Sequence, residues 1–92
     1  MPIHPSTTPG KNENVAFRRL AEGEGGVLLH LESGEYHGIN EVGCLIWELL
    51  DGERTVDGLV LAVGEEIEDP PADLADQVIS FLESLHKRDL VR

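Results

Sequence analysis

The stretch that most constrains the fold is residues 25–52, because its apolar residues change their spacing at a single point. Before Asn40 they alternate with a period of two, which is typical of half-buried strands, and residues 32–34 read as a tight turn between two such strands. After Asn40 the spacing becomes that of a helix. The sequence therefore predicts a hairpin whose second strand, residues 35–39, runs directly into an amphipathic helix.

Local signals support this junction. Asn40 stands where a helix N-cap belongs, since its side-chain oxygen can accept a hydrogen bond from an amide of the first turn. Glu41 follows near the positive end of the helix dipole. Asp51-Gly52 is typical of a helix end. The apolar face of the helix, which Trp47 widens, is expected to consist of Val42, Leu45, Ile46, Leu49 and Leu50.

The rest of the chain supplies one more strand and two more helices. Residues 15–20 predict a first strand. Thr55 is the expected N-cap of a second helix, which ends near Ile67 because the following Pro70-Pro71 pair cannot continue it. A third helix is expected from Pro71 to about Lys87. Its apolar stripe should consist of Leu74, Val78, Phe81, Leu82 and Leu85.

Three of the five prolines lie within residues 1–13, among Ser, Thr, Gly and Asn, and this composition is typical of a segment that does not pack. We therefore expect a disordered N-terminal arm over residues 1–13 and a single domain over residues 14–92, with a modest core. The order of elements predicts an α+β fold, winged-helix-like, in which a small three-stranded antiparallel sheet is followed by three helices on one of its faces. Its outer strand would be an open edge.

Catalytic and metal-binding patterns are not found. His30 and His37 are expected to face each other across the hairpin with no third ligand at metal spacing, and Cys44 lies in an apolar helix, where a small buried thiol is expected. We therefore predict no enzyme activity, no metal and no cofactor. The lone cysteine, the absence of a signal-peptide pattern and the absence of a long apolar run predict a cytoplasmic protein with no membrane span.

The charge excludes nucleic acid as a partner. Seven basic residues stand against eighteen acidic ones, and from Glu41 onward there are four against thirteen, a net −9. A DNA-binding winged helix is disfavoured because the expected second helix carries no Lys or Arg for phosphate contact. An acyl or peptidyl carrier protein is disfavoured because no serine has the required Asp-Ser-Leu context. The acidic surface is either solubilising or a docking face for a basic partner.

Several motifs, in order, resemble the small family of the pyrroloquinoline quinone biosynthesis protein D (PqqD-like), also called the precursor-peptide recognition element. The resemblance covers about residues 15–91 and is strongest for stand-alone members that serve lasso peptide biosynthesis. Three residues depart from the usual pattern: Ile39 replaces Leu, His37 replaces an aromatic and Asp89 replaces Gly. The motifs are Ile39-Asn40, Ile46-Trp47, Asp51-Gly52 followed by Arg54-Thr55-Val56, and Phe81-Leu82 with the closing Asp89-Leu90-Val91.

The resemblance implies an adaptor that binds the leader segment of a ribosomally made precursor peptide and presents it to separate enzymes. In lasso peptide biosynthesis these enzymes are a leader peptidase of the cysteine protease class and a cyclase. The alternative within the family is a peptide chaperone that delivers a precursor to a radical SAM or other modifying enzyme.

Strand addition suits an open edge, since a peptide can pair its main chain with the outer strand while side-chain pockets give selectivity. We expect the edge at residues 35–39 and a second wall on the third helix. The expected peptide-binding residues are Glu35, Tyr36, His37, Gly38, Ile39, Ala75, Ile79, Leu82 and His86. Ile39, Ile79 and Leu82 should form a pocket for an apolar side chain. The alternative for Ile79 is that it thickens the core stripe.

Overall fold

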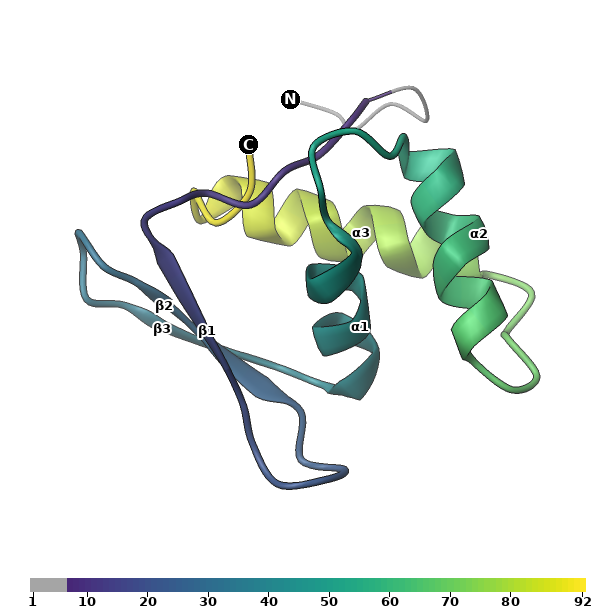
Figure 1. Cartoon of the computed structure of the whole chain (residues 1–92), viewed down its shortest axis with the longest axis horizontal. Coiled ribbons are helices and arrows are strands. Elements are labelled where there is room, and N and C mark those ends of the chain that lie inside the picture. The colour runs from purple at the N-terminus through teal and green to yellow at the C-terminus, as the bar shows by residue number, and fades with distance from the viewer. Residues whose placement is uncertain (1–6) are drawn as a thin grey trace.

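The computed structural model describes residues 7–92, and its elements follow the expected order of three strands and then three helices (Figure 1). The strands form one antiparallel sheet in the order β1-β2-β3, which confirms the α+β fold. The elements are β1 (Val15–Arg19), β2 (Gly26–His30), β3 (Tyr36–Ile39), α1 (Glu41–Leu49), α2 (Val56–Glu66) and α3 (Leu74–Lys87).

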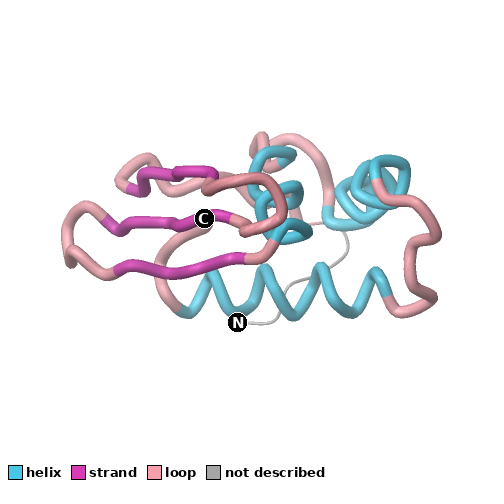
Figure 2. Tube along the Cα trace, turned by 90° about the horizontal axis from the view of Figure 1, so that it is seen from below, coloured by secondary structure: helices cyan, strands magenta, loops and turns pink. Residues whose placement is uncertain are grey.

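The helices bury one face of the sheet. In Figure 2 the long helix α3 runs beside β3, the strand that lies nearest to it, and continues beyond the sheet toward α2. Leu28 of β2 is completely buried, whereas Leu31, just after the strand, is 57% exposed. The alternation in the sequence identified the strand, and the structure shows that Leu28 and His30 are on the face toward the core. The largest fully buried side chains include Leu28, Ile46, Leu59, Leu82 and Leu85.

Side-chain caps fix where the helices begin. The Asn40 Oδ1 atom accepts a hydrogen bond from the Gly43 amide at 2.7 Å, and Thr55 Oγ1 accepts one from the Gly58 amide at 3.1 Å. Both predicted N-caps are confirmed, because capping depends on residues that are close in sequence. The helix α3 begins at Leu74, three residues later than expected, and its N-cap Asp73 makes no side-chain cap bond.

Gly25 allows β2 to start beside the end of β3. Its φ is +79°, and a Cβ at this position would lie 2.1 Å from the carbonyl oxygen of Ile39. Only glycine fits such a close approach of two backbones. The residue therefore holds the β3–α1 junction against the sheet.

The N-terminal segment differs from the expected disordered arm in residues 7–12. Gly10 and Arg92 exchange backbone hydrogen bonds of 3.2 and 2.8 Å, and Pro9 is fully buried with its carbonyl oxygen accepting from the Gly52 amide. Figure 1 shows this segment passing close to the C terminus. The partners that hold this segment on the domain are more than forty positions away in the chain, so its composition alone did not reveal them. Residues 1–6 of the expected arm lie outside the described residues.

None of the helices within residues 7–92 combines the length and the apolar character that a bilayer crossing requires.

Candidate binding groove

The outer edge of β3 carries backbone groups that have no partner within residues 7–92. The His30 amide donates to the Glu35 carbonyl oxygen at 3.0 Å, and the ladder continues in register with Leu28 opposite His37 and Gly26 opposite Ile39. In an antiparallel pair, alternate residues direct their N–H and C=O groups to opposite sides of the strand. Tyr36 and Gly38 therefore direct theirs away from β2, toward the free edge.

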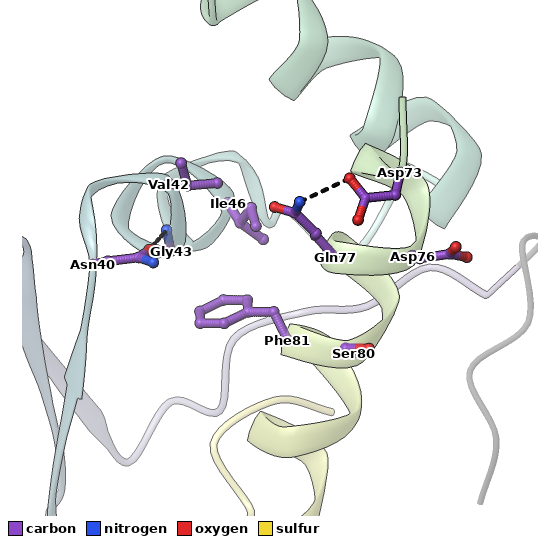
Figure 3. A pocket seen from close by; sticks show the side chains of 9 residues that line it. All are labelled: Asn40, Val42, Gly43, Ile46, Asp73, Asp76, Gln77, Ser80 and Phe81. Carbon is purple, nitrogen blue, oxygen red and sulfur yellow. Dashed lines mark hydrogen bonds between the residues drawn. The ribbon is translucent and has the colours of Figure 1, made fainter. Parts of the chain in front are cut away.

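A cavity of about 460 Å³ lies where β3 ends and α1 faces α3 (Figure 3). The Phe81 ring points from α3 toward Gly43 of α1, and a Cβ on Gly43 would lie only 3.0 Å from that ring. The missing side chain at Gly43 therefore lets Phe81 lie against α1. The cavity is lined by Asn40, Val42, Gly43, Ile46, Asp73, Asp76, Gln77, Ser80 and Phe81.

A small cleft marks the other end of β3, where the C-terminal end of α3 approaches the strand. Tyr36 and His37 line it together with Arg88. The pKa of His37 is lowered, first by burial of the imidazole and then by the positive charge of Arg88. The Arg88 guanidinium therefore lies close enough to β3 for its charge to act on His37.

These two cavities outline one groove between the edge of β3 and one stripe of α3. We call it the β3–α3 groove. Its helix wall follows helical spacing: Gln77, Ser80 and Phe81 line the first cavity, and Arg88 lines the second. Phe81 is the large apolar side chain of this wall, and polar groups flank it at both ends.

The sequence-predicted strand residues lie at this groove, with one difference in exposure. Tyr36 is 75% exposed, Glu35 and Gly38 are exposed and His37 is half-buried, whereas Ile39 is only 8% exposed. Ile39 therefore belongs largely to the core at the end of the strand.

The predicted helix residues lie elsewhere on α3. Leu82 is fully buried in the core, and half-buried Ile79 packs against the core cluster. Ala75 and His86 are exposed. By helical periodicity, Ala75, Ile79 and His86 flank the buried stripe on the side opposite Phe81 and Arg88, and they line neither of the two cavities that mark the groove.

Sequence reasoning missed Phe81 and Arg88 as groove residues. Hydrophobic periodicity places Phe81 in the core stripe, and Phe81 does pack against the core, but the periodicity gives no sign of its second contact at the groove and none of Arg88. An amphipathic helix has two flanks beside its buried stripe, and hydrophobic periodicity does not say which flank turns toward a sheet. The one available signal was Gly43, because a glycine inside an apolar helix often marks the close approach of another element.

The chemistry of the described residues suits binding. Within residues 7–92 no three His, Cys, Asp or Glu side chains gather as metal ligands do. Cys44 is fully buried, as predicted, and its pKa is raised, first by burial, so that the thiol stays protonated. The His30 ring is held between Asp89 and the Ser33 amide. What the groove offers is an unpaired strand edge beside an apolar side chain.

Comparison with known proteins finds one matching family and two solved structures of similar fold. Residues 25–91 match the sequence model of the family described as coenzyme PQQ synthesis protein D. The solved structure of TbiB1 in complex with the TbiA(beta) leader peptide has 26% sequence identity and a TM-score of 0.74, covering 90% of this chain and 94% of that chain. A lasso peptide synthetase B1 complexed with the leader peptide has the same fold at 20% identity and a TM-score of 0.74, covering 92% and 98%. No curated protein sequence gives a match.

Proposed function

This chain belongs to the family of coenzyme PQQ synthesis protein D, and from that premise we propose that it is an adaptor that binds the leader of a ribosomally made precursor peptide. The observation that carries the proposal is the unpaired backbone of Tyr36 and Gly38 beside the groove wall of α3. The related TbiB1, of nearly the same length, is described in complex with a leader peptide, which supports the same class of ligand for this chain.

The leader would bind as a fourth strand. Its main chain pairs with the N–H and C=O groups of Tyr36 and Gly38, which contributes affinity that depends little on the leader sequence. Its side chains alternate between two faces, and those on the helix side enter the cavity beside Val42, Ile46 and Phe81. An apolar leader residue at that position supplies selectivity.

The protein acts on its peptide only through binding. We propose that a separate leader peptidase of the cysteine protease class, and then a cyclase, carry out the chemistry on the bound precursor in the cytoplasm. An adaptor that holds the leader and contacts the peptidase makes cleavage quasi-intramolecular, so it accelerates the reaction through effective concentration. The sequence motifs that resemble stand-alone members of lasso peptide biosynthesis favour this pathway.

Reconstitution tests the proposal. The precursor peptide and leader peptidase encoded beside this chain are purified, leader binding is measured by fluorescence anisotropy, and leader removal is followed by mass spectrometry. We expect the adaptor alone to leave the precursor intact and its addition to speed cleavage by the peptidase. Cleavage by the adaptor alone would refute the adaptor role, and absence of leader binding would refute the proposed function as a whole.

A further inference from the structure

Arg88 lies at the groove and has no carboxylate partner in the part of the chain that the structure describes. Among residues 7–92, Arg19, Arg54 and Arg92 each form a salt bridge, whereas Arg88 forms none, like Arg18 of β1. Glu35 lines the same cleft as Arg88, yet no salt bridge joins them. The exposed guanidinium therefore has its donors available for a ligand at the Tyr36 end of the groove.

The backbone that carries Arg88 is well anchored. Its amide donates to the Leu85 carbonyl oxygen at 3.1 Å, and the next residue, Asp89, contacts the Nε2 atom of buried His30 at 3.1 Å. The guanidinium consequently extends from a fixed turn over β3. At this position its positive charge is the second cause, after burial, that lowers the pKa of His37.

The opposite end of the groove has the opposite charge. Asp73 and Asp76 line the cavity near Asn40, where β3 ends. From Asp76 to Arg88 the helix rises by about 18 Å. An extended strand covers that distance in about five residues. A bound peptide therefore meets a positive charge near one end and negative charges near the other.

We propose that Arg88 is a specificity-determining residue that binds a carboxylate side chain of the leader and thereby fixes the direction of the bound strand. The inference rests on the proposed function and extends it. An added strand that continues the antiparallel sheet runs from the Ile39 end toward the Tyr36 end, so its C-terminal side lies at Arg88. An Asp or Glu is therefore required on the C-terminal side of the binding segment, and Asp73 and Asp76 repel it from the N-terminal side.

The test is selection from a displayed library of random 12-residue peptides on the wild-type protein and on Arg88→Gln. Lys87→Gln is the matched control, because it removes the same charge one position away and Lys87 lines neither of the two cavities that mark the groove. We expect wild-type selection to enrich Asp or Glu on the C-terminal side of an apolar segment. Arg88→Gln should lose this preference and Lys87→Gln should retain it.

Affinity measurements on one selected peptide complete the test. Changing its acidic residue to Gln should weaken binding to the wild type roughly threefold to tenfold, since the pair is partly exposed, and should leave binding to Arg88→Gln unchanged. The inference would be overturned if the enriched peptides showed no preference for an acidic residue, or preferred one on the N-terminal side. It would also be overturned if Lys87→Gln removed the preference as completely as Arg88→Gln. In each of these cases the proposed function would stand. A wild-type selection that enriches no peptide would refute both. Melting curves of each variant confirm that it is folded.

Discussion

The imidazole of His30 and the carboxylate of Asp89, 59 positions apart in the sequence, meet with Nε2 3.1 Å from Oδ2. The Ser33 amide donates to Nδ1 of the same ring, so the ring proton is on Nε2 and is donated to Asp89. The Asn12 side-chain amide donates to the Asp89 carbonyl oxygen at 2.6 Å. Asp89 thereby joins the sheet, the N-terminal segment and the turn that follows α3.

Asp89 occupies a strained position. It has a φ of 60° in the turn that ends α3, where the Leu90 amide donates to the Leu85 carbonyl oxygen and the Asp89 amide to that of His86. This is the Schellman arrangement, which usually has glycine at the left-handed position. The side-chain contacts of Asp89 are the structural reason that an aspartate stands in place of glycine here.

We predict that Asp89→Ala destabilises the protein more than Asp89→Gly. Alanine loses the contact with His30 and retains a left-handed strain of roughly 1–2 kcal/mol. Glycine loses the same contact but relieves the strain. The contact itself contributes at most about 1 kcal/mol, because the Asp89 side chain is 78% exposed. Urea denaturation measures the difference, and equal stabilities for the two variants would contradict the account of strain.

We predict that Gly38→Pro abolishes leader binding while Gly38→Ala does not. The Gly38 N–H faces the free edge, so proline removes a donor for the added strand without removing a hydrogen bond of the β2–β3 ladder. A Cβ at Gly38 meets nothing within 4 Å, so alanine retains both the donor and the space. Isothermal titration with the leader peptide compares the two variants. Unchanged affinity in a folded Gly38→Pro variant would show that the peptide does not pair with this edge.

Sequence reasoning succeeded where the relevant interactions are local. The N-cap bonds of Asn40 and Thr55 span three residues each, and the change of period at Asn40 places the β3–α1 junction directly. It failed for residues 7–12, whose backbone partners are near the C terminus and at the start of α2. Those pairings depend on the completed fold and leave no periodic signal in the sequence.

The strand side of the candidate groove follows from the order of the elements, whereas its helix side does not. The sequence predicts an open edge at residues 35–39, and the register adds that Tyr36 and Gly38 are the residues that face it. The opposing wall depends on how α3 is rotated about its axis, and the buried stripe alone is compatible with either flank. The structure turns Phe81 toward β3 and α1, and places Ile79 on the other side.

We predict that Phe81→Ala weakens leader binding by roughly 1–3 kcal/mol, about 5- to 150-fold, because it removes the apolar anchor of the groove. Ile79→Ala is the matched control. It should lower the unfolding temperature, since Ile79 packs against the core, and leave affinity unchanged. Phe81→Leu keeps most of the packing against the core but removes the ring from the groove, so it shows whether a loss of affinity comes from the missing ring or from a less stable fold. If only Ile79→Ala lowered the affinity, the leader would contact the flank of α3 that carries Ile79, as the sequence predicts.

We predict that Gly43→Ala weakens leader binding without weakening the fold. A Cβ there would lie 3.0 Å from the Phe81 ring and 3.1 Å from the Ile39 Cβ, so the ring must move into the cavity. Alanine improves helix propensity by about 1 kcal/mol, which offsets the crowding. Gly64→Ala in α2 is the control, because its Cβ meets only Leu74 at an ordinary 3.5 Å. Anisotropy titrations with both variants should show a loss of affinity only for Gly43→Ala.

We predict that His37 makes the protein less stable as the pH falls below the ordinary histidine pKa of 6.5. Burial, and then Arg88, lower the pKa of His37 in the folded state. Between the folded and unfolded pKa values the unfolded chain binds more protons, so the stability contributed by neutral His37 is fully present above pH 6.5 and is lost as the pH falls through the folded pKa. When the free energy of unfolding is plotted against pH, the curve of His37→Gln should fall less steeply below pH 6.5 than that of the wild type. The curve of Arg88→Gln should also fall less steeply than that of the wild type, because the charge that is the second cause of the lowered His37 pKa has been removed. Urea titrations from pH 8 to pH 5 measure all three proteins, and identical slopes would show that His37 is not perturbed by the groove.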